Sequence, residues 1–423
     1  MIPDRPRPRP RRCAALAPIW RGMCLAGLTL TADLSAADWP QFLGPDRNGV
    51  SHESIRPTLP AGGPPLQWSV KLGTGWSGPV VVGDQVLIHH RQGGEELLES
   101  LDAGTGKSRW KNAQPTGYED DFGFDNGPRG TPCVSGQRVY TFGAEGRLTA
   151  VSLTDGQTVW SQPLGANLHA RKGFFGWACS PLVISNRVVL QLGGADGAGI
   201  VALNESDGQL TWKATSDEAG YAAPVTLVLG GRTRIAAFNR EGLVLLDAAT
   251  GKVEQRHPWR SRMQASVNAA TPVVFGDRVL LSASYDTGAT FLNVAGAEPK
   301  TLWSGDDAIS SHYASLVPAD GLVFGYHGRA ESRPVFRCVD VATGKVRWTE
   351  ASGGGGSVLR AENTLILLRD SGELQLAPVS GESFKPGDRH QILGAQTRAV
   401  PALSRGVLYA RDRTKLVAVK LGE

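Results

Sequence analysis

One pattern recurs along this 423-residue chain and constrains its fold more than any other feature. The pattern reads Pro-Val-Val-x-Gly-Asp-x-Val and is followed, about twenty residues later, by Thr-Gly-Lys-x-x-Trp; the first copy runs from Pro79 to Trp110. Further copies open at Pro132, Pro181, Pro224, Pro272 and Pro401, and two degenerate copies lie between the last two prolines. A period of roughly 40–50 residues is typical of propellers and solenoids.

Each copy contains four short stretches that suit strands with one buried face, such as residues 138–142. Asp or Asn followed by Gly separates the stretches, as tight turns require. Without a leader of about 37 residues, about 48 residues remain for each of eight repeats, which fits four-stranded blades. The sequence therefore predicts an all-β chain, folded as an eight-bladed β-propeller of four-stranded blades.

The chain ends supply the clue to ring closure. The eighth copy opens at Pro401 and stops at Leu421, before any Trp segment, whereas an orphan ending at residues 65–70 carries Trp68 ahead of the first full copy. We expect the N- and C-terminal strands to complete one blade together, because this closes the ring and removes exposed sheet edges.

Six of the eleven tryptophans fall at one repeat position: 68, 110, 160, 212, 303 and 348. The fourth copy has Gln255 there instead. We expect each indole to pack between neighbouring blades and to donate its N–H to a backbone carbonyl.

Residues 1–37 are predicted to be a signal peptide and residues 38–423 the propeller domain. A basic start is followed by an apolar run at 24–30 and by the small residues 35–37. The Arg11-Arg12 pair leaves a twin-arginine route open. The apolar run is too short for an integral membrane span, so a periplasmic or secreted protein is predicted.

The net charge of +4 gives no electrostatic support for nucleic-acid binding, because the first twelve residues alone hold five arginines. Three cysteines follow the leader: Cys133, Cys179 and Cys338. We expect them to be buried apolar side chains, with a Cys133–Cys179 bridge as the alternative.

The repeat ending Asp/Asn/Ser-x-x-Thr/Asp-Gly-Lys/Gln-x-x-Trp resembles the pyrroloquinoline-quinone (PQQ) repeat. That family includes quinoprotein alcohol dehydrogenases and the propeller lipoprotein of the outer-membrane β-barrel assembly machine. The opening motif at 38–51 (DWPQFLGPDRNGVS) and the GPRGTP motif at 127–132 resemble a group of secreted bacterial "PQQ-like β-propeller repeat" proteins. The resemblance covers about residues 38–421 and implies the fold, but fold alone does not fix function.

The resemblance to the dehydrogenases would imply PQQ with calcium as a cofactor. Those enzymes carry two adjacent cysteines against the quinone and a Glu, an Asn and an Asp around the calcium ion. This sequence has no Cys-Cys pair, and none of the three calcium ligands can be matched. We therefore expect no cofactor and no metal, and keep PQQ with calcium as the alternative.

When the repeats are superimposed on their prolines, the position three residues earlier is rich in aromatic residues and arginine. Because this position precedes the innermost strand, its residues should ring one mouth of the central channel. With an uncertainty of one residue in three copies, the candidates are Trp76, Arg129, Trp177 (or Ala178), Tyr221, Asn268 (or Ala269), His312 or Tyr313, and Arg398. Such a ring suits a planar or anionic ligand; alternatively, the side chains fill the channel.

Three connections at the same mouth are long. The link at 111–131 is acidic and aromatic, whereas those at 161–180 and 256–262 are basic and aromatic. They either pack on each other as a salt-bridged lid or form a recognition patch.

We therefore predict an exported, monomeric and non-catalytic binding scaffold. Its partner is expected to be a protein or peptide of the cell envelope, engaged at the mouth with the long loops. One alternative is a PQQ-dependent dehydrogenase of a small alcohol or sugar, in which Arg129, Arg398 and Trp76 would hold the quinone. A third is a structural module that resembles the barrel-assembly lipoprotein and is bound to a membrane partner, although the sequence around Cys24 fits lipidation poorly.

Overall fold

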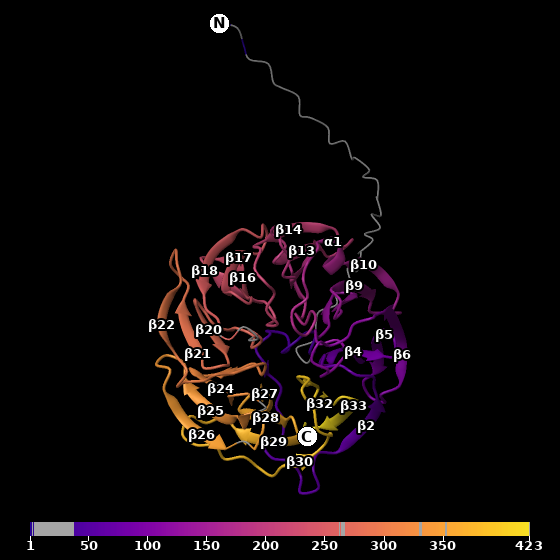
Figure 1. The fold of residues 1–423 in the computed structure, drawn as a ribbon, viewed down its shortest axis with the longest axis vertical. Coiled ribbons are helices and arrows are strands. Elements are labelled where there is room, and N and C mark those ends of the chain that lie inside the picture. The colour runs from indigo at the N-terminus through magenta and orange to yellow at the C-terminus, as the bar shows by residue number, and fades with distance from the viewer. Residues whose placement is uncertain are drawn as a thin grey trace. The chain divides into compact units, whose positions relative to one another are not determined.

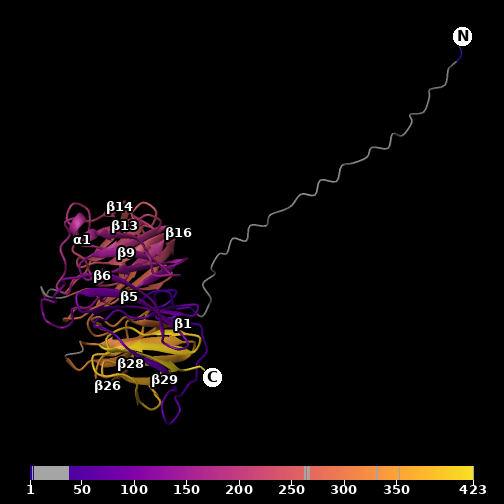
Figure 2. The same cartoon turned by 90° about the vertical axis from the view of Figure 1, so that its right-hand side faces the viewer.

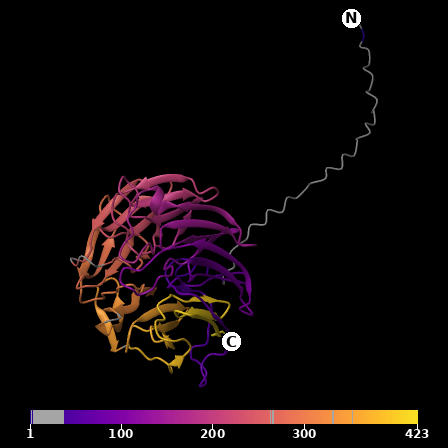
Figure 3. The same cartoon turned by 45° about the vertical axis from the view of Figure 1, so that its right-hand side comes forward.

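The computed structural model describes residues 38–422, except 262, 264–266, 330–331 and 352; before residue 38 it describes only Met1 and Pro3. The predicted signal peptide therefore lies, apart from those two residues, outside the described part of the chain. From residue 38 onward, eight twisted antiparallel sheets surround a central axis (Figure 1) and fan out around it in the oblique view of Figure 3. The predicted eight-bladed propeller is confirmed.

The blades follow the repeats in order, each with its first strand innermost. Blade 1 holds β3 (Val80–Val82), β4 (Gln85–Gln92), β5 (Glu95–Asp102) and β6 (Ser108–Pro115); blade 2 holds β7 (Cys133–Ser135), β8 (Arg138–Phe142), β9 (Arg147–Ser152) and β10 (Thr158–Pro163). Blade 3 holds β11 (Leu182–Ile184), β12 (Arg187–Gln191), β13 (Ile200–Asn204) and β14 (Leu210–Ala214); blade 4 holds β15 (Val225–Leu229), β16 (Arg232–Phe238), β17 (Gly242–Asp247) and β18 (Val253–Pro258). Blade 5 holds β19 (Val273–Phe275), β20 (Arg278–Ala283), β21 (Gly288–Asn293) and β22 (Lys300–Gly305); blade 6 holds β23 (Val317–Ala319), β24 (Leu322–His327), β25 (Val335–Asp340) and β26 (Val346–Ala351).

The last two blades depart from this order. Blade 7 has β27 (Gly356–Ala361), β28 (Thr364–Arg369), β29 (Glu373–Pro378) and the two-residue β30 (His390–Gln391), with β1 (Val50–Ser51) added parallel to β27. Blade 8 combines β31 (Ala402–Ser404), β32 (Val407–Arg411) and β33 (Lys415–Lys420) with β2 (Leu66–Lys71) from the other end of the chain. In Figure 1 β2 lies beside β33. The predicted closure is confirmed. The one helix in the described residues, α1 (Leu164–Asn167), is a single turn.

The repeated indoles join neighbouring blades as predicted. Five donate their N–H to a carbonyl of the next blade: Trp68 to Ala103 (2.8 Å), Trp110 to Leu153 (3.1 Å), Trp160 to Glu205 (3.1 Å), Trp303 to Val341 (2.8 Å) and Trp348 to Ser380 (2.9 Å). The exception, Trp212, packs on Gly251 in the same way, but its N–H has no hydrogen-bond acceptor. Where Trp is missing, the amide of Gln255 donates to Val294 O (2.9 Å) and Gly296 O (2.7 Å). Gln255 thus keeps the polar link between blades without the ring.

The Gly of the Thr-Gly-Lys or Asp-Gly-Gln turn is needed for this contact. Gly156 has a φ of +75°, and a Cβ there would lie 2.5 Å from a ring carbon of Trp110. Any larger residue would be strained in its backbone and would displace the indole.

The opening motif fills the axis of the ring. We call residues 38–51 the axial plug. Trp39 pairs with Val81 in blade 1, Pro40 O accepts from Val134 N in blade 2 (2.8 Å), and β1 pairs with blade 7. In Figure 1 the indigo segment crosses the middle of the ring. The side view of Figure 2 places β1 beside the sheets of the last blades.

Arg47 anchors the axial plug to blade 3. Its guanidinium donates to Pro181 O (2.8 Å), Ser180 O (3.0 Å) and Gln41 Oε1 (2.9 Å), and the residue is 4% exposed. Burial lowers the pKa of Arg47, because a cation removed from water is costly. The hydrogen bonds to the oxygen acceptors offset part of this cost.

Cys133, Cys179 and Cys338 are buried free thiols, and no Cys133–Cys179 bridge is formed. Burial raises the pKa of Cys133 and of Cys179 to about 11. The thiols are therefore protonated and serve as small apolar side chains.

Two buried acid–histidine pairs lie between β4 and β5. His90 Nε2 lies 3.2 Å from Glu99 Oε2, and His89 Nε2 lies 3.7 Å from Glu96 Oε2. Burial lowers the pKa of His89 to about 3 and raises the pKa of Glu96 to about 7. The second pair is therefore not an ion pair near neutral pH, because His89 is uncharged.

Replacing Glu96 with Gln should remove one pH-dependent contribution to stability. A carboxyl whose pKa rises on folding favours the folded state below its unfolded value of 4.5, and this advantage is lost as pH rises through about 7. A Gln amide oxygen can still accept from Ala144 N, as Glu96 Oε1 does at 2.9 Å. Between pH 4.5 and pH 8, the Glu96→Gln variant should gain on the order of 3 kcal/mol of unfolding free energy relative to the parent.

Urea denaturation of both proteins at the two pH values measures this difference. The contribution of His89 is present in both proteins and cancels. A difference between variant and parent that is the same at pH 4.5 and pH 8 would contradict the assignment.

Candidate functional site

Residues that precede the innermost strands line one cavity of about 330 Å³, here called the rim cavity. Seven of the eight blades contribute to it. Six of the predicted rim residues are among its walls: Trp76, Arg129, Tyr221, His312, Tyr313 and Arg398. The remaining lining comes from Phe42, Phe124, Phe175, Ala178, Ser180, Ala223, Val267, Ala269, Tyr285, Arg329 and Val400.

The other two candidates lie outside the lining. In the third copy Ala178 faces the rim cavity, whereas Trp177 is buried and donates its N–H to Leu192 O at 2.8 Å. In the fifth copy Ala269 faces it, whereas the buried Asn268 amide donates to Asn239 O at 2.8 Å. In both copies, the residue three positions before the proline faces the rim cavity, and the residue one position earlier does not.

Arg129 is held rigidly at the wall of the rim cavity. One of its nitrogens, Nη2, is paired with Asp120, and the two side chains are 8% and 0% exposed. Its guanidinium carbon lies 4.8 Å from the ring centroid of Trp76 and 5.7 Å from that of Phe175. The other two nitrogens, Nε and Nη1, are buried without a hydrogen-bond partner. Burial raises the pKa of the neighbouring Tyr118 to about 12, although the charge of Arg129 opposes the shift.

A second arginine contacts the same indole. The guanidinium carbon of Arg398 lies 4.9 Å from the ring centroid of Trp76 and 5.7 Å from that of Tyr313. Tyr313 in turn donates its hydroxyl proton to Asp370 at 2.9 Å. Cation–π contacts of this kind fix both the rings and the charges.

Tyr285 and Arg329 line the rim cavity but lie outside the repeat position that predicted the other rim residues. Tyr285 and Asp286 form the tip of the β20–β21 hairpin with φ values of 61° and 56°. A bulky residue in this left-handed region is strained, and such strain is concentrated at functional sites. The ring of Tyr285 meets His312 edge-on at 5.4 Å, and the guanidinium carbon of Arg329 lies 4.6 Å from its centroid.

The first two long loops pack against each other beside the rim cavity. Their phenylalanines form what we call the aromatic lip: Phe122, Phe124, Phe174 and Phe175, with ring centroids 5.2–6.3 Å apart. Lys172 and Asp121 add an ion pair at 2.7 Å. These two loops therefore pack on each other across a salt bridge, as the first alternative expects, and this packing does not test the second alternative, a recognition patch.

The third long link is paired differently. Arg256 pairs with Asp217 in the connection that leads into blade 4, and Arg260 pairs at 2.9 Å with Glu241 in the β16–β17 turn. These two arginines are thus paired with acidic residues beside or within blade 4 and not with the acidic first loop.

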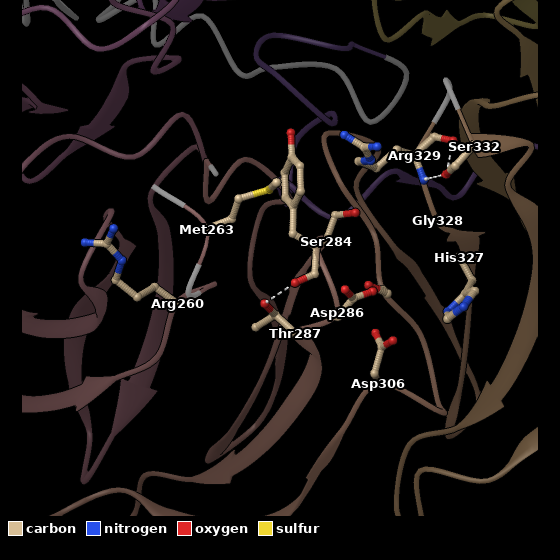
Figure 4. A pocket seen from close by; sticks show the side chains of 12 residues that line it. Arg260, Met263, Ser284, Asp286, Thr287, Asp306, His327, Gly328, Arg329 and Ser332 are labelled. Carbon is tan, nitrogen blue, oxygen red and sulfur yellow. Dashed lines mark hydrogen bonds between the residues drawn. The ribbon is translucent and has the colours of Figure 1, made fainter. Parts of the chain in front are cut away.

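A polar groove of about 900 Å³ adjoins the rim cavity (Figure 4). It shares Tyr285 and Arg329 with the cavity and contains Arg260, Met263, Asp286, Asp306 and His327. In Figure 4 Arg260 and Met263 lie on one side of the groove and His327, Arg329 and Ser332 on the other.

Comparison with known proteins places this propeller in a family. The model of the family described as "Outer membrane protein assembly factor BamB" matches residues 60–162 and 94–350. This chain belongs to that family. The BamB of Legionella pneumophila (strain Paris) is 29% identical over 187 residues, which cover 42% of this chain and 41% of the relative. The match thus spans less than half of that relative's own length.

Solved structures in and beyond the BamB family share the fold. BamB from Moraxella catarrhalis superimposes with a TM-score of 0.62 at 15% identity, covering 84% of this chain and 97% of that one. Quinohemoprotein alcohol dehydrogenase from Comamonas testosteroni also gives a TM-score of 0.62, at 14% identity over 92% of this chain and 81% of that one. Because the two scores are equal, the fold does not separate a binding scaffold from an enzyme.

The residues of the rim cavity do not fit a quinone held with calcium. Calcium takes six to eight oxygen ligands, mainly carboxylates and carbonyls. No Asp, Glu or Asn is among the described residues that line the rim cavity. Across the described part of this BamB-family chain, no group of three or more His, Cys, Asp or Glu is placed to hold a metal ion. Within the same part, no helix has the length and hydropathy to cross a membrane.

Proposed function

We propose that this protein is a non-catalytic β-propeller scaffold of the cell envelope that binds a protein partner in outer-membrane protein assembly. It acts as a periplasmic or secreted monomer, and the partner binds at the mouth formed by the rim cavity and the aromatic lip. The names of its BamB relatives support the assembly role, and the mouth supplies a surface suited to a protein.

The observation that carries this proposal is the exposure of the aromatic lip. Phe122 is 52% exposed and Phe124 is 46% exposed, although both pack on other rings. Apolar rings held rigidly beside a pocket are typical anchors of protein interfaces. The neighbouring Arg129 and Trp76 are residue types enriched at binding hot spots.

Replacing the two exposed rings should impair assembly without unfolding the propeller. In cells that lack this protein, we expect fewer folded, heat-modifiable outer-membrane β-barrel proteins. The parent chain should restore them, and the Phe122→Ser/Phe124→Ser variant should restore clearly less, because truncated interface anchors cost about 2 kcal/mol or more.

Leu66→Ser is the matched control. Leu66 is 60% exposed, but it lies on β2 at the outer edge of blade 8, away from the mouth. This variant should restore assembly fully. If cells without the protein assemble barrels normally, the assembly role is wrong. If the Phe variant restores them as well as Leu66→Ser does, the mouth is not the binding surface.

A further inference from the structure

We infer that the rim cavity receives a single carboxylate carried by an acidic peptide segment of the partner. This inference rests on the proposed function, because it names the chemical group that enters the mouth. The apolar neighbours of that carboxylate would then lie on the aromatic lip.

The charge of the rim cavity selects an anion. Arg129, Arg329 and Arg398 line it, and no carboxylate is among its described lining residues. Asp120 lies behind Arg129 with its side chain fully buried, so it fixes the guanidinium without facing the ligand. A pocket with this balance attracts negative groups and repels positive ones.

Arg129 has hydrogen-bond donors left for a ligand. Its side chain is 92% buried, and neither Nε nor Nη1 has a hydrogen-bond acceptor among the described residues. Buried guanidinium donors without partners are costly, whereas a bond to a carboxylate is charge-assisted and strong. Both nitrogens have almost no accessible surface, so a ligand can reach them only after the rings packed on the guanidinium move.

The size and floor of the rim cavity limit what can enter. About 330 Å³ holds a few side chains but not a folded element. Phe42 of the axial plug is part of the lining. The plug is hydrogen-bonded to inner strands both before and after Phe42 in the chain, so it closes the cavity on that side. The carboxylate must therefore enter from the mouth, past the aromatic lip.

The rings of the rim cavity suit a flat group. Trp76 and Tyr313 are held by Arg398, and Tyr221 is fixed because its hydroxyl accepts from Phe175 N at 2.9 Å. Planar carboxylate and amide groups stack on such rings without first having to order them. A peptide segment with an Asp or Glu between apolar residues presents both kinds of group.

Calorimetric titration with three short peptides tests the inference on the chain from residue 38 onward. The first peptide is acetyl-Gly-Phe-Asp-Phe-Gly-amide, the second has Asn in place of Asp, and the third has Asn but a free C-terminal carboxylate. We expect the Asp peptide to bind at least tenfold more tightly than the capped Asn peptide, and less tightly as salt is raised. Tighter binding of the third peptide than of the capped Asn peptide would also support a carboxylate site and would assign it to a chain end.

A charge-matched variant shows whether Arg129 is responsible. In Arg129→Gln/Asp120→Asn, both members of the buried pair are neutral, so no unpaired carboxylate remains in the loop. The tenfold preference should disappear in this variant and persist in Arg278→Gln, which changes an exposed residue at the start of β20. A circular dichroism melt confirms that both variants are folded.

Three results would overturn the inference: no binding of any peptide, equal binding of the Asp and capped Asn peptides, or a preference that survives in the Arg129→Gln/Asp120→Asn variant. Any of these, together with impaired assembly in the Phe122→Ser/Phe124→Ser variant, would reject the carboxylate site and leave the proposed function in place. Tighter binding of the Asp peptide together with normal assembly in the Phe122→Ser/Phe124→Ser variant would support the carboxylate site and reject the proposed function.

Discussion

A chain that begins at residue 73 should not unfold in a single cooperative transition. The deletion removes both the axial plug and β2, which among the described strands pairs with β33 alone. Blade 8 would then end in an open edge, and blade 1 would lose the indole of Trp68 that covers Gly106. Since the ring is held by contacts between neighbouring blades, its opening exposes two blade faces at once.

Differential scanning calorimetry and size-exclusion chromatography measure this effect. A chain that begins at residue 38 is the control, because it keeps every described strand and the plug, and it should give one sharp transition as a monomer. We expect the shorter chain to aggregate or to melt broadly. A sharp transition of the shorter chain within a few degrees of the control would show that closure contributes little.

Replacing Arg47 with Leu should destabilise the propeller by on the order of 3 kcal/mol. The variant leaves Ser180 O and Pro181 O without the two guanidinium donors that now satisfy them. Because hydrogen bonds to charged groups are each worth more than neutral ones, the loss is large for one side chain. Loosening the plug should also disturb Phe42 at the floor of the rim cavity.

Arg333→Leu is the matched control for this experiment. Arg47 and Arg333 have nearly the same left-handed φ, 53° and 54°, but Arg333 is exposed. The backbone cost of Leu in this region is thus shared by the two variants. Urea denaturation should show the loss for Arg47→Leu only, and a similar loss in both variants would trace the effect to the backbone and not to the buried guanidinium.

The repeat pattern was sufficient to predict the blades because the interactions that define a blade are local. A four-stranded sheet forms between residues close in sequence, and the Trp of each copy meets the next copy along the chain. The orphan Trp68 predicted ring closure for the same reason, since the eighth copy stops before its Trp segment. Gln255 shows that the position was read correctly even where the residue type changed, because its amide makes the link that an indole N–H makes elsewhere.

The axial plug could not be predicted in this way. The opening motif at 38–51 was recognised as a signature, but its hydrogen bonds reach blades 1, 2, 3 and 7, at separations that no repeat period encodes. The same is true of part of the rim cavity. Tyr285 and Arg329 do not lie at the repeat position three residues before the proline, and Phe42 belongs to the axial plug. An aromatic residue at the tip of a tight hairpin was the signal that could have identified Tyr285.

The axial plug also bears on the order in which the molecule can fold. Glu53, directly after the plug, accepts a hydrogen bond from the backbone N–H of Arg405, 352 positions away, and β2 must wait for β33. The first part of the propeller to be synthesised is thus among the last to find its place. Until the final blade exists, the early segment has no partners at one end and its apolar residues remain uncovered. Folding that ends with so distant a contact is slow and vulnerable to aggregation. The chain should therefore need chaperones most while its last two blades have not yet been synthesised.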